Sequence, residues 1–225
     1  MRVREAVAAR RSVRGFVETP VAVDVLRALA EAAARAPSGG NLQPWHVHIV
    51  AGEAMARLKA AMAGKLLRGE AETAEYTVYP DGLGEPYRAR RSEVGEALYA
   101  RLGIPREDRE ARRRWFAENF RFFGAPAAYF CSVDRGMGPP QWSDLGMYLQ
   151  TLMLLAVDAG LATCPQECWS LYSETIGRFL GLPEGRMLFC GVAIGFEDEG
   201  AAANALRSER APVGEWLRVV GNGEG

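Results

Sequence analysis

Three arginines lie close together near the N-terminus, in the segment RRSVRGF. Arg10, Arg11 and Arg14 flank Ser12 within five residues. Guanidinium groups at this spacing can clamp a phosphate dianion, because each planar fork binds two oxygens at once. The alternative is a solvated helix end, where cationic side chains interact favourably with the helix dipole. The segment therefore predicts either a phosphate site or a basic helix terminus.

A second polar segment, APSGGNLQPW, covers residues 36–45. Gly39 and Gly40 give its backbone conformational freedom, and Asn41 and Gln43 supply amide side chains. An amide both donates and accepts hydrogen bonds, so such a loop can recognise the edge of a heterocycle. An ordinary turn between a helix and a strand explains the same residues, and the segment alone leaves both interpretations open.

Apolar periodicity indicates the elements that must position these two segments. Apolar residues at helical spacing predict helices over residues 2–10, 21–36, 53–62 and 144–160. Apolar runs predict three strands: HVHIV over residues 46–50, and continuous apolar runs over residues 127–133 and 186–195. The order α-α-β-α, an insert, β-α-α-β and a tail predicts an α+β fold, in a single domain over residues 1–225, rather than regular βαβ winding.

Residues 69–119 differ in character from the rest of the chain, because tyrosines and prolines stand among basic runs such as RARR and ARRRW. We expect an insert that caps the functional face as a lid and sets substrate preference. The aromatic residues in and beside this insert either line a pocket for flat substrates or pack in the core. The candidates are Tyr76, Tyr79, Tyr87, Trp115, Phe116, Phe120, Phe122, Phe123 and Trp142.

Composition and charge exclude several classes of protein. The chain has 225 residues, of which 48% are hydrophobic, enough for a core without disulfides or metals. A formal net charge of −1 provides no basic field for nucleic acid. No segment reaches the roughly 20 apolar residues of a membrane span. The four cysteines are too scattered for a disulfide framework, which indicates reduced thiols and a cytoplasmic location.

Other motifs in the sequence do not predict a functional site. Neither G-x-G-x-x-G after a strand nor a P-loop is present, so a nucleotide-like cofactor must bind in another way. His46 and His48 lack acidic or thiol neighbours, and no metal site is expected. Cys164 and Cys168 lack the context of a redox pair and are interpreted as small buried residues.

The two opening segments together resemble the paired signature of the nitroreductase family: RRSVRGF followed by APSGGNLQPWHVHIV. ENFRFFGAPAAYF, DLGMYLQTLMLLAVDAGLATCPQE and NALRSERAPVGEWLRVVG are similar to later segments of that family, in the same order. The resemblance covers nearly the whole chain except the insert. It implies a nitroreductase-type fold, with a central mixed but mostly antiparallel sheet flanked by helices. It also implies an intertwined homodimer that holds FMN at the subunit interface.

The resemblance also assigns roles to residues. Phosphate, ribityl and pyrimidine contacts fall on Arg10, Arg11, Ser12 and Arg14, with further charge from Arg207 and Arg210. Asn119 falls beside the pyrimidine ring, and Pro165, Gln166 and Glu167 fall on the loop near N5. The loop that reaches the flavin of the other subunit carries Pro37, Ser38, Gly39 and Asn41, with Gln43 beside them. The expected substrate pocket contains Tyr79, Phe122, Phe123 and Trp142.

The chemistry implied is a ping-pong reaction at flavin N5, in which NAD(P)H reduces FMN and a nitroaromatic, quinone or similar small aromatic acceptor takes the electrons. The cofactor performs this chemistry, so no side chain is assigned as a catalyst. A cation such as Arg14 would stabilise the anionic reduced flavin and raise its potential. Two positions depart from the family pattern, with Phe122 where some relatives have Lys and Cys168 where Gly is common. The alternatives are a same-fold reductive dehalogenase or dehydrogenase, or a non-catalytic flavin-binding protein.

Overall fold

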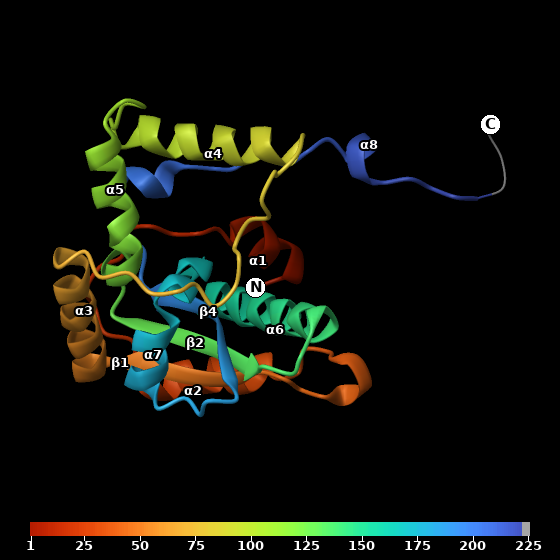
Figure 1. Ribbon diagram of the computed structural model, residues 1–225. Helices are drawn as coiled ribbons and strands as arrows, with labels where there is room; N and C mark the ends of the chain where they lie inside the picture. Colours follow the sequence, from red (N-terminus) through yellow and green to blue (C-terminus); the bar gives the residue numbers. More distant parts are fainter. Residues whose placement is uncertain (222–225) are drawn as a thin grey trace.

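A four-stranded sheet forms the centre of the protein (Figure 1). The computed structural model describes residues 1–221; residues 222–225, the end of the expected domain, lie outside the described part. The strands lie in the order β1-β2-β4-β3 and comprise β1 (His46–Ala51), β2 (Ala127–Asp134), β3 (Ala162–Gln166) and β4 (Arg186–Gly195). The three strands predicted from apolar runs are confirmed, and β3 is additional.

Helices surround this sheet. The α-helices are α1 (Val3–Ala9), α2 (Val23–Ala33), α3 (Gly52–Leu67), α4 (Tyr87–Arg101), α5 (Arg109–Ala117), α6 (Pro139–Asp158), α7 (Ser173–Leu180) and α8 (Val213–Trp216). Short 3₁₀ segments are η1 (Gly39–Asn41), η2 (Glu118–Gly124), η3 (Glu167–Tyr172) and η4 (Ala202–Ala205). The α+β class is confirmed.

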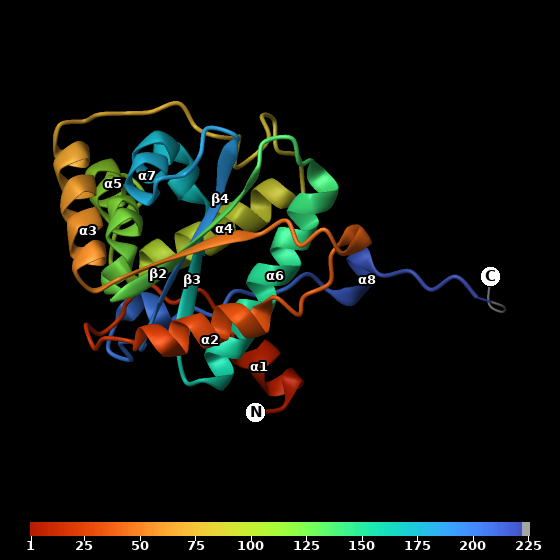
Figure 2. The same ribbon diagram turned by 90° about the horizontal axis from the view of Figure 1, so that it is seen from below.

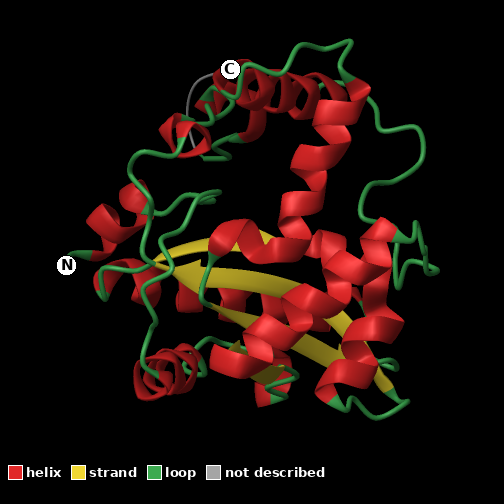
Figure 3. Ribbon diagram, turned by 90° about the vertical axis from the view of Figure 1, so that its left-hand side faces the viewer, coloured by secondary structure: helices red, strands yellow, loops and turns green. Residues whose placement is uncertain are grey.

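Both faces of the sheet are covered, and the alternation of side chains along β2 shows how. Ala127, Tyr129 and Cys131 belong to the core that includes α2 and α6, whereas Ala128 and Phe130 belong to the core that includes α3 and η2. α2 and α6 pack together on the first face (Figure 2). Figure 3 shows the strands enclosed between helices. A strand buried on both faces is expected to be a continuous apolar run, as β2 is.

β3 escaped the sequence prediction because its five residues include Pro165 and Gln166 and form no continuous apolar run. Proline is tolerated there because β3 is an edge strand, where one side of the backbone has no strand to donate to. Each pair of adjacent strands in the sheet is antiparallel. Within residues 1–221 the parallel component of the expected mixed sheet is limited to an isolated bridge between Ser12 and Thr163.

The central helix α6 begins earlier than predicted. It starts at Pro139, five residues before the expected start at Asp144, because proline suits the first turn of a helix, where its missing N–H is not needed. Gly160 follows the end of α6 with a φ of +74°, the left-handed conformation expected of a glycine beyond a helix C-terminus.

The 69–119 segment contains two helices, α4 and α5, that stand above the sheet (Figure 1). Neither has a fully buried residue. The segment is anchored where it leaves the body: the Glu72 carboxylate accepts hydrogen bonds from the backbone N–H groups of Glu174 and Thr175, at 2.9 and 3.2 Å, and pairs with Lys65. Within residues 1–221, no helix has the length and apolarity needed to cross a bilayer.

Candidate functional site

The basic turn after α1 runs beside the edge strand β3. Val13 donates its backbone N–H to the Thr163 carbonyl at 3.0 Å and is buried, so the neighbouring side chains of Ser12 and Arg14 point away from the core. Gly15 is required here, because a Cβ at this position would lie 2.3 Å from the Cβ of Ala201. The extended turn thereby presents polar side chains along one side of the backbone.

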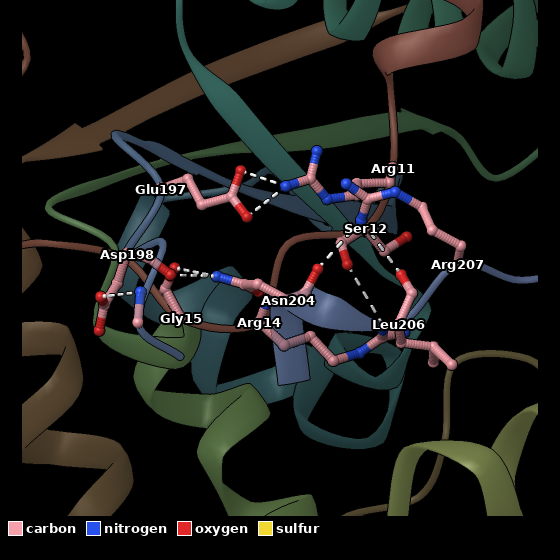
Figure 4. Close-up of polar contacts among 10 residues, drawn as sticks. Arg11, Ser12, Arg14, Gly15, Glu197, Asp198, Asn204, Leu206 and Arg207 are labelled. Carbon is pink, nitrogen blue, oxygen red and sulfur yellow. Dashed lines mark hydrogen bonds and ion pairs between the residues drawn. The ribbon is translucent and has the colours of Figure 1, made fainter. Parts of the chain in front are cut away.

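Asn204 fastens this turn to the C-terminal segment (Figure 4). Its Oδ1 accepts a hydrogen bond from the Arg14 backbone N–H at 2.7 Å, and its Nδ2 donates to the carbonyls of Gly15 and Asp198 at 2.9 Å each. Asn204 is 5% exposed, so its amide is satisfied by these contacts rather than by water. The sequence prediction missed Asn204, whose only signal was a lone amide in an alanine-rich run.

A basic cavity of about 620 Å³ lies between the turn and the C-terminal segment. The five arginines that line it are Arg10, Arg11, Arg14, Arg207 and Arg210. Ser12, Ser208 and Gln150 add polar groups, and no acidic residue among residues 1–221 lines the cavity. The fold therefore brings together all six residues predicted to contact the phosphate and ribityl end, although nearly the whole chain separates the two groups.

Arg11 differs from the other arginines of this cavity. Its Nη2 pairs with the Glu197 carboxylate, a partner that the sequence did not reveal, and its Nε is buried without a hydrogen-bond partner (Figure 4). An unpaired buried donor among several cations suits an anionic ligand with multiple acceptor oxygens, because such a ligand would satisfy it. Phosphate has this property.

A larger cavity of about 1160 Å³ adjoins the first, and Arg14 lines both. The end of β3 and the start of η3 form its floor with Pro165, Gln166, Glu167 and Cys168. Aromatic side chains form much of the remaining wall: Tyr76, Tyr79, Tyr99, Trp115, Phe116 and Phe123. A cavity of this size and lining can hold a flat ring system with a second aromatic molecule.

An amide network holds the floor of the aromatic cavity to its wall. Gln166 donates through Nε2 to the backbone carbonyl of Asn119 at 2.8 Å and to its Oδ1 at 3.2 Å. Trp169 Nε1 donates to Gln166 Oε1 at 3.3 Å, and Asn119 Nδ2 donates to the Phe116 carbonyl at 2.9 Å. Gln166 is 3% exposed, so its side chain fixes the position of Asn119, and Asn119 lines the cavity.

A strained turn at the end of η2 separates two neighbouring phenylalanines. Phe122 and Phe123 have φ values of 56° and 53°, which cost non-glycine residues about 1–3 kcal/mol each. Lys59 stabilises the turn from behind, donating through Nζ to the Ala125 carbonyl at 2.7 Å. Burial lowers the pKa of Lys59. Phe123 consequently lines the cavity, whereas Phe122 is 0% exposed and stacks on Trp169, with ring centroids 4.6 Å apart.

Phe122 and Trp142 do not line the aromatic cavity, and their predicted part in a substrate pocket stays a prediction. Phe122 belongs to the core because the left-handed turn points adjacent side chains in different directions. Trp142, on α6, lies beneath the wall, with its ring 5.9 Å from that of Tyr76 and 6.1 Å from that of Phe189. Tyr79 and Phe123 do line the aromatic cavity.

The loop over residues 36–45 lies apart from both cavities of the same chain. Asp144, which is buried on α6, accepts hydrogen bonds from the Gly39 backbone N–H at 3.3 Å, and Ser38 Oγ accepts one from the Gln43 N–H at 3.0 Å. Asn41 and Gln43 adopt left-handed φ values of 57° and 49°. Pro37, Ser38, Gly39, Asn41 and Gln43 line neither cavity. The predicted contact with the cofactor of another subunit stays a prediction.

Burial also sets the state of the groups beneath the cavities. It raises the pKa of the Cys164 thiol to about 11, against the opposing effect of the nearby Arg14 and Arg10 guanidinium groups. Burial likewise raises the pKa of Cys168 and of the Glu167 carboxyl. The thiols are therefore neutral at ordinary pH and act as small packing groups rather than nucleophiles.

Comparisons with known proteins match this geometry. The model of the nitroreductase family matches residues 7–196. The 4-nitrobenzoate reductase of Pseudomonas putida is 36% identical over 96% of this chain and 94% of its own length. The FMN and NADPH-dependent nitroreductase NfnB from sphigopyxis sp. strain HMH superposes with a TM-score of 0.94 at 47% identity, covering 98% of this chain and 100% of that one.

A further solved structure, the FMN-dependent nitroreductase NfnB from Mycobacterium smegmatis in complex with NADPH, has a TM-score of 0.90 at 35% identity. It covers 96% of this chain and 97% of its own. Because the family model and these relatives span nearly the whole length of the protein, the predicted fold is confirmed. The chain belongs to the nitroreductase family.

Proposed function

We propose that the protein is an FMN-dependent oxidoreductase that uses NAD(P)H to reduce nitroaromatic, quinone or related aromatic acceptors. One observation carries this proposal: a basic cavity of phosphate-binding character shares Arg14 with a cavity that has aromatic walls. FMN has the matching shape, a phosphate joined by a ribityl chain to a flat ring system. The related 4-nitrobenzoate reductase and the two NfnB enzymes support the reaction class.

In this proposal the chain's own residues bind and orient FMN. Arg10, Arg14, Arg207 and Arg210 hold the phosphate through charge-assisted hydrogen bonds, and Ser12 donates beside them. Bound FMN supplies the hydride transfer chemistry, so no side chain is needed as a nucleophile or general base.

The aromatic cavity completes the arrangement. Asn119, held by Gln166, offers its amide to the polar edge of the ring system, and Pro165 and Glu167 contribute the floor. Reductant and acceptor would use this cavity in turn, as ping-pong chemistry requires. We further propose that the 69–119 segment acts as a lid within a single domain, because α4 and α5 wall the cavity without contributing buried residues to the core.

We also propose a homodimer in which the loop over residues 36–45 reaches the FMN of the partner copy. Asp144 and the Ser38 hydroxyl give this loop a defined shape, yet it does not approach either cavity of its own chain. A second copy would bring it there. The four cysteines are unpaired in the structure, which supports the proposed cytoplasmic location.

Purified protein tests this proposal directly. We expect it to bind FMN stoichiometrically, to be reduced anaerobically by a nicotinamide cofactor, and to be reoxidised by nitrobenzene. Light scattering should report a dimer. A protein that binds FMN but shows no flavin reduction by either NADH or NADPH in stopped flow would be a flavin-binding protein without this activity. Reoxidation by halogenated phenols but not by nitroaromatics would favour reductive dehalogenation instead.

A further inference from the structure

Helix α4 separates two differently lined spaces. Arg88, Arg91, Leu98 and Tyr99 line the aromatic cavity. The opposite side of the helix, over residues 89–101, lines a groove of about 810 Å³ against the C-terminal segment. Arg88 and Arg91 are three residues apart, so they share one helix face and place two guanidinium groups on the lid wall of the aromatic cavity.

Arg91 is held in place by an aromatic ring rather than by an acid. Its guanidinium carbon lies 4.0 Å from the centroid of the Tyr79 ring, and both residues line the aromatic cavity. Stacking on the ring face orients the guanidinium plane and leaves its N–H edge free to donate. Arg91 makes no ion pair or side-chain hydrogen bond with any residue between 1 and 221.

Three other arginines of the lid have acidic partners within the chain. Arg88 pairs with Glu85, Arg90 with Glu215 and Arg112 with Glu96. Asp81 and Glu167 are the acidic residues lining the aromatic cavity, and neither forms an ion pair with Arg91. A cationic fork on a cavity wall with unused donors is the arrangement that binds an oxyanion from solution.

We propose that Arg91, stacked on Tyr79 with Arg88 beside it, forms an oxyanion-binding subsite that selects ligands of the aromatic cavity carrying a carboxylate or a phosphate monoester. The subsite rests on the proposed function, because its ligands are an acidic nitroaromatic acceptor or the 2′-phosphate of NADPH. Both present oxygens to the same planar fork. Arg14 also lines the basic cavity, whereas Arg91 lines the aromatic cavity alone, so the two cations address different ligand groups.

Steady-state kinetics with matched ligand pairs tests the subsite on the FMN-loaded protein. The acceptor pair is 4-nitrobenzoate and nitrobenzene, and the donor pair is NADPH and NADH. Arg91→Ala should raise the KM of the anionic member of at least one pair about tenfold or more, because a hydrogen bond to a charged group is lost. The KM of the counterpart that lacks the carboxylate or the 2′-phosphate should stay unchanged, and so should every kcat.

Three further variants test whether the effect of Arg91→Ala is specific to this guanidinium and its stacking on Tyr79. Arg113→Ala removes the same charge from an exposed position on α5 outside both cavities, so all four KM values should match those of the wild type. Tyr79→Phe keeps the stacked ring, so the ratio of KM values within each ligand pair should stay at its wild-type value. Tyr79→Leu removes the ring and should reproduce part of the Arg91→Ala effect, since the guanidinium loses its orientation.

Calorimetry provides a readout without turnover. The dissociation constants of two ligand pairs are measured with the FMN-loaded protein. The first pair is benzoate and benzamide, and the second is adenosine 2′-phosphate and adenosine. A loss confined to benzoate assigns the subsite to the acceptor, and one confined to adenosine 2′-phosphate assigns it to the nicotinamide cofactor. Equal binding of both anions by Arg91→Ala and wild type, or equal changes for charged and uncharged ligands, would overturn the subsite. Turnover of nitrobenzene with NADH by the wild type requires neither a carboxylate nor a 2′-phosphate. Absence of this turnover would therefore count against the proposed function and not against the subsite.

Discussion

Strand β2 and helix α4 belong to two regions that differ in how many of their side chains are buried. Seven of the eight residues of β2 are buried, whereas no residue of α4 is fully buried. Apolar burial dominates folding stability, so the body around β2 must carry most of it. Polar contacts such as Arg135–Glu75 join the lid to the body, and an ion pair with an exposed partner contributes little to stability. The comparison supports the proposal that the body accounts for folding and FMN binding, and that the lid selects the ligand.

The largest expected effect separates the stability of the two regions. Leu152 on α6 is 0% exposed, and Leu152→Ala should lower the free energy of unfolding by about 2–5 kcal/mol, because it leaves a cavity in a tightly packed core. Leu98→Ala on the lid should cost about 1 kcal/mol or less, since that side chain is only partly buried. Urea denaturation of the two variants measures the contrast. Similar losses in both would mean that the lid is part of the core.

The next effect concerns cofactor binding by the body. Arg14 lines both cavities, and Arg14→Ala should weaken FMN binding about ten- to a hundredfold, as expected for loss of a charge-assisted hydrogen bond. Arg14→Lys should retain part of the affinity. Fluorescence titration of the apoprotein with FMN gives the dissociation constants, and Arg113→Ala on the lid is the charge-matched control. Unchanged FMN affinity in Arg14→Ala would remove this residue from the phosphate site.

A smaller effect is the dependence of stability on pH. The two histidines of the chain both lie on β1, and the pKa of each is lowered from its usual 6.5, mainly by burial and by the charge of Arg186. The unfolded chain therefore binds protons first as pH falls below about 6.5, and stability is lost on acidification through that range. His46→Gln combined with His48→Gln should flatten the melting temperature between about pH 6.5 and the lowered folded-state pKa values. An unchanged slope would place the acid sensitivity elsewhere.

The smallest expected effect lies within the lid. Arg112 holds α5 to α4 through two hydrogen bonds of 2.8 Å to Glu96, and it also stacks on Tyr99. Glu96→Gln should change the free energy of unfolding only slightly, because the pair is partly exposed and screened. Limited proteolysis should nevertheless cut the 69–119 segment faster, since the two helices are less firmly joined. A loss comparable to that of Leu152→Ala would contradict the distinction between body and lid.

Much of the body was predictable from residue patterns. β2 and β4 are short continuous apolar runs, and α6 carries apolar residues at helical spacing, so local sequence indicates both the type and the burial of these elements. β3 was not predictable in the same way, because Pro165 and Gln166 interrupt any apolar pattern and the strand is recognised only by its pairing with β4. Apolar periodicity did not predict the two helices of the lid, because neither contains a fully buried residue.

The candidate site was predicted residue by residue only where it followed a local motif. Arg10 to Arg14 and the amide of Asn119 were identified in this way, whereas Asn204, Glu197 and Lys59 were not, because their roles consist of contacts with residues far along the chain. Phe122 and Phe123 show that local sequence can also fail to predict where two adjacent side chains lie. They are adjacent and chemically identical, yet a left-handed turn places one in the core and the other on the cavity wall.

The sequence by itself determined which segments are basic, which are apolar and which residues have the donors to meet an anion, since these are properties of side chains and of their local spacing. Only the tertiary structure decided that the arginines after α1 meet Arg207 and Arg210 around one cavity. It also decided that Arg91 stacks on Tyr79 with its donors unused. The physical reason is that a binding site depends on distances between residues remote in sequence, and those distances are set when the two cores pack against the sheet.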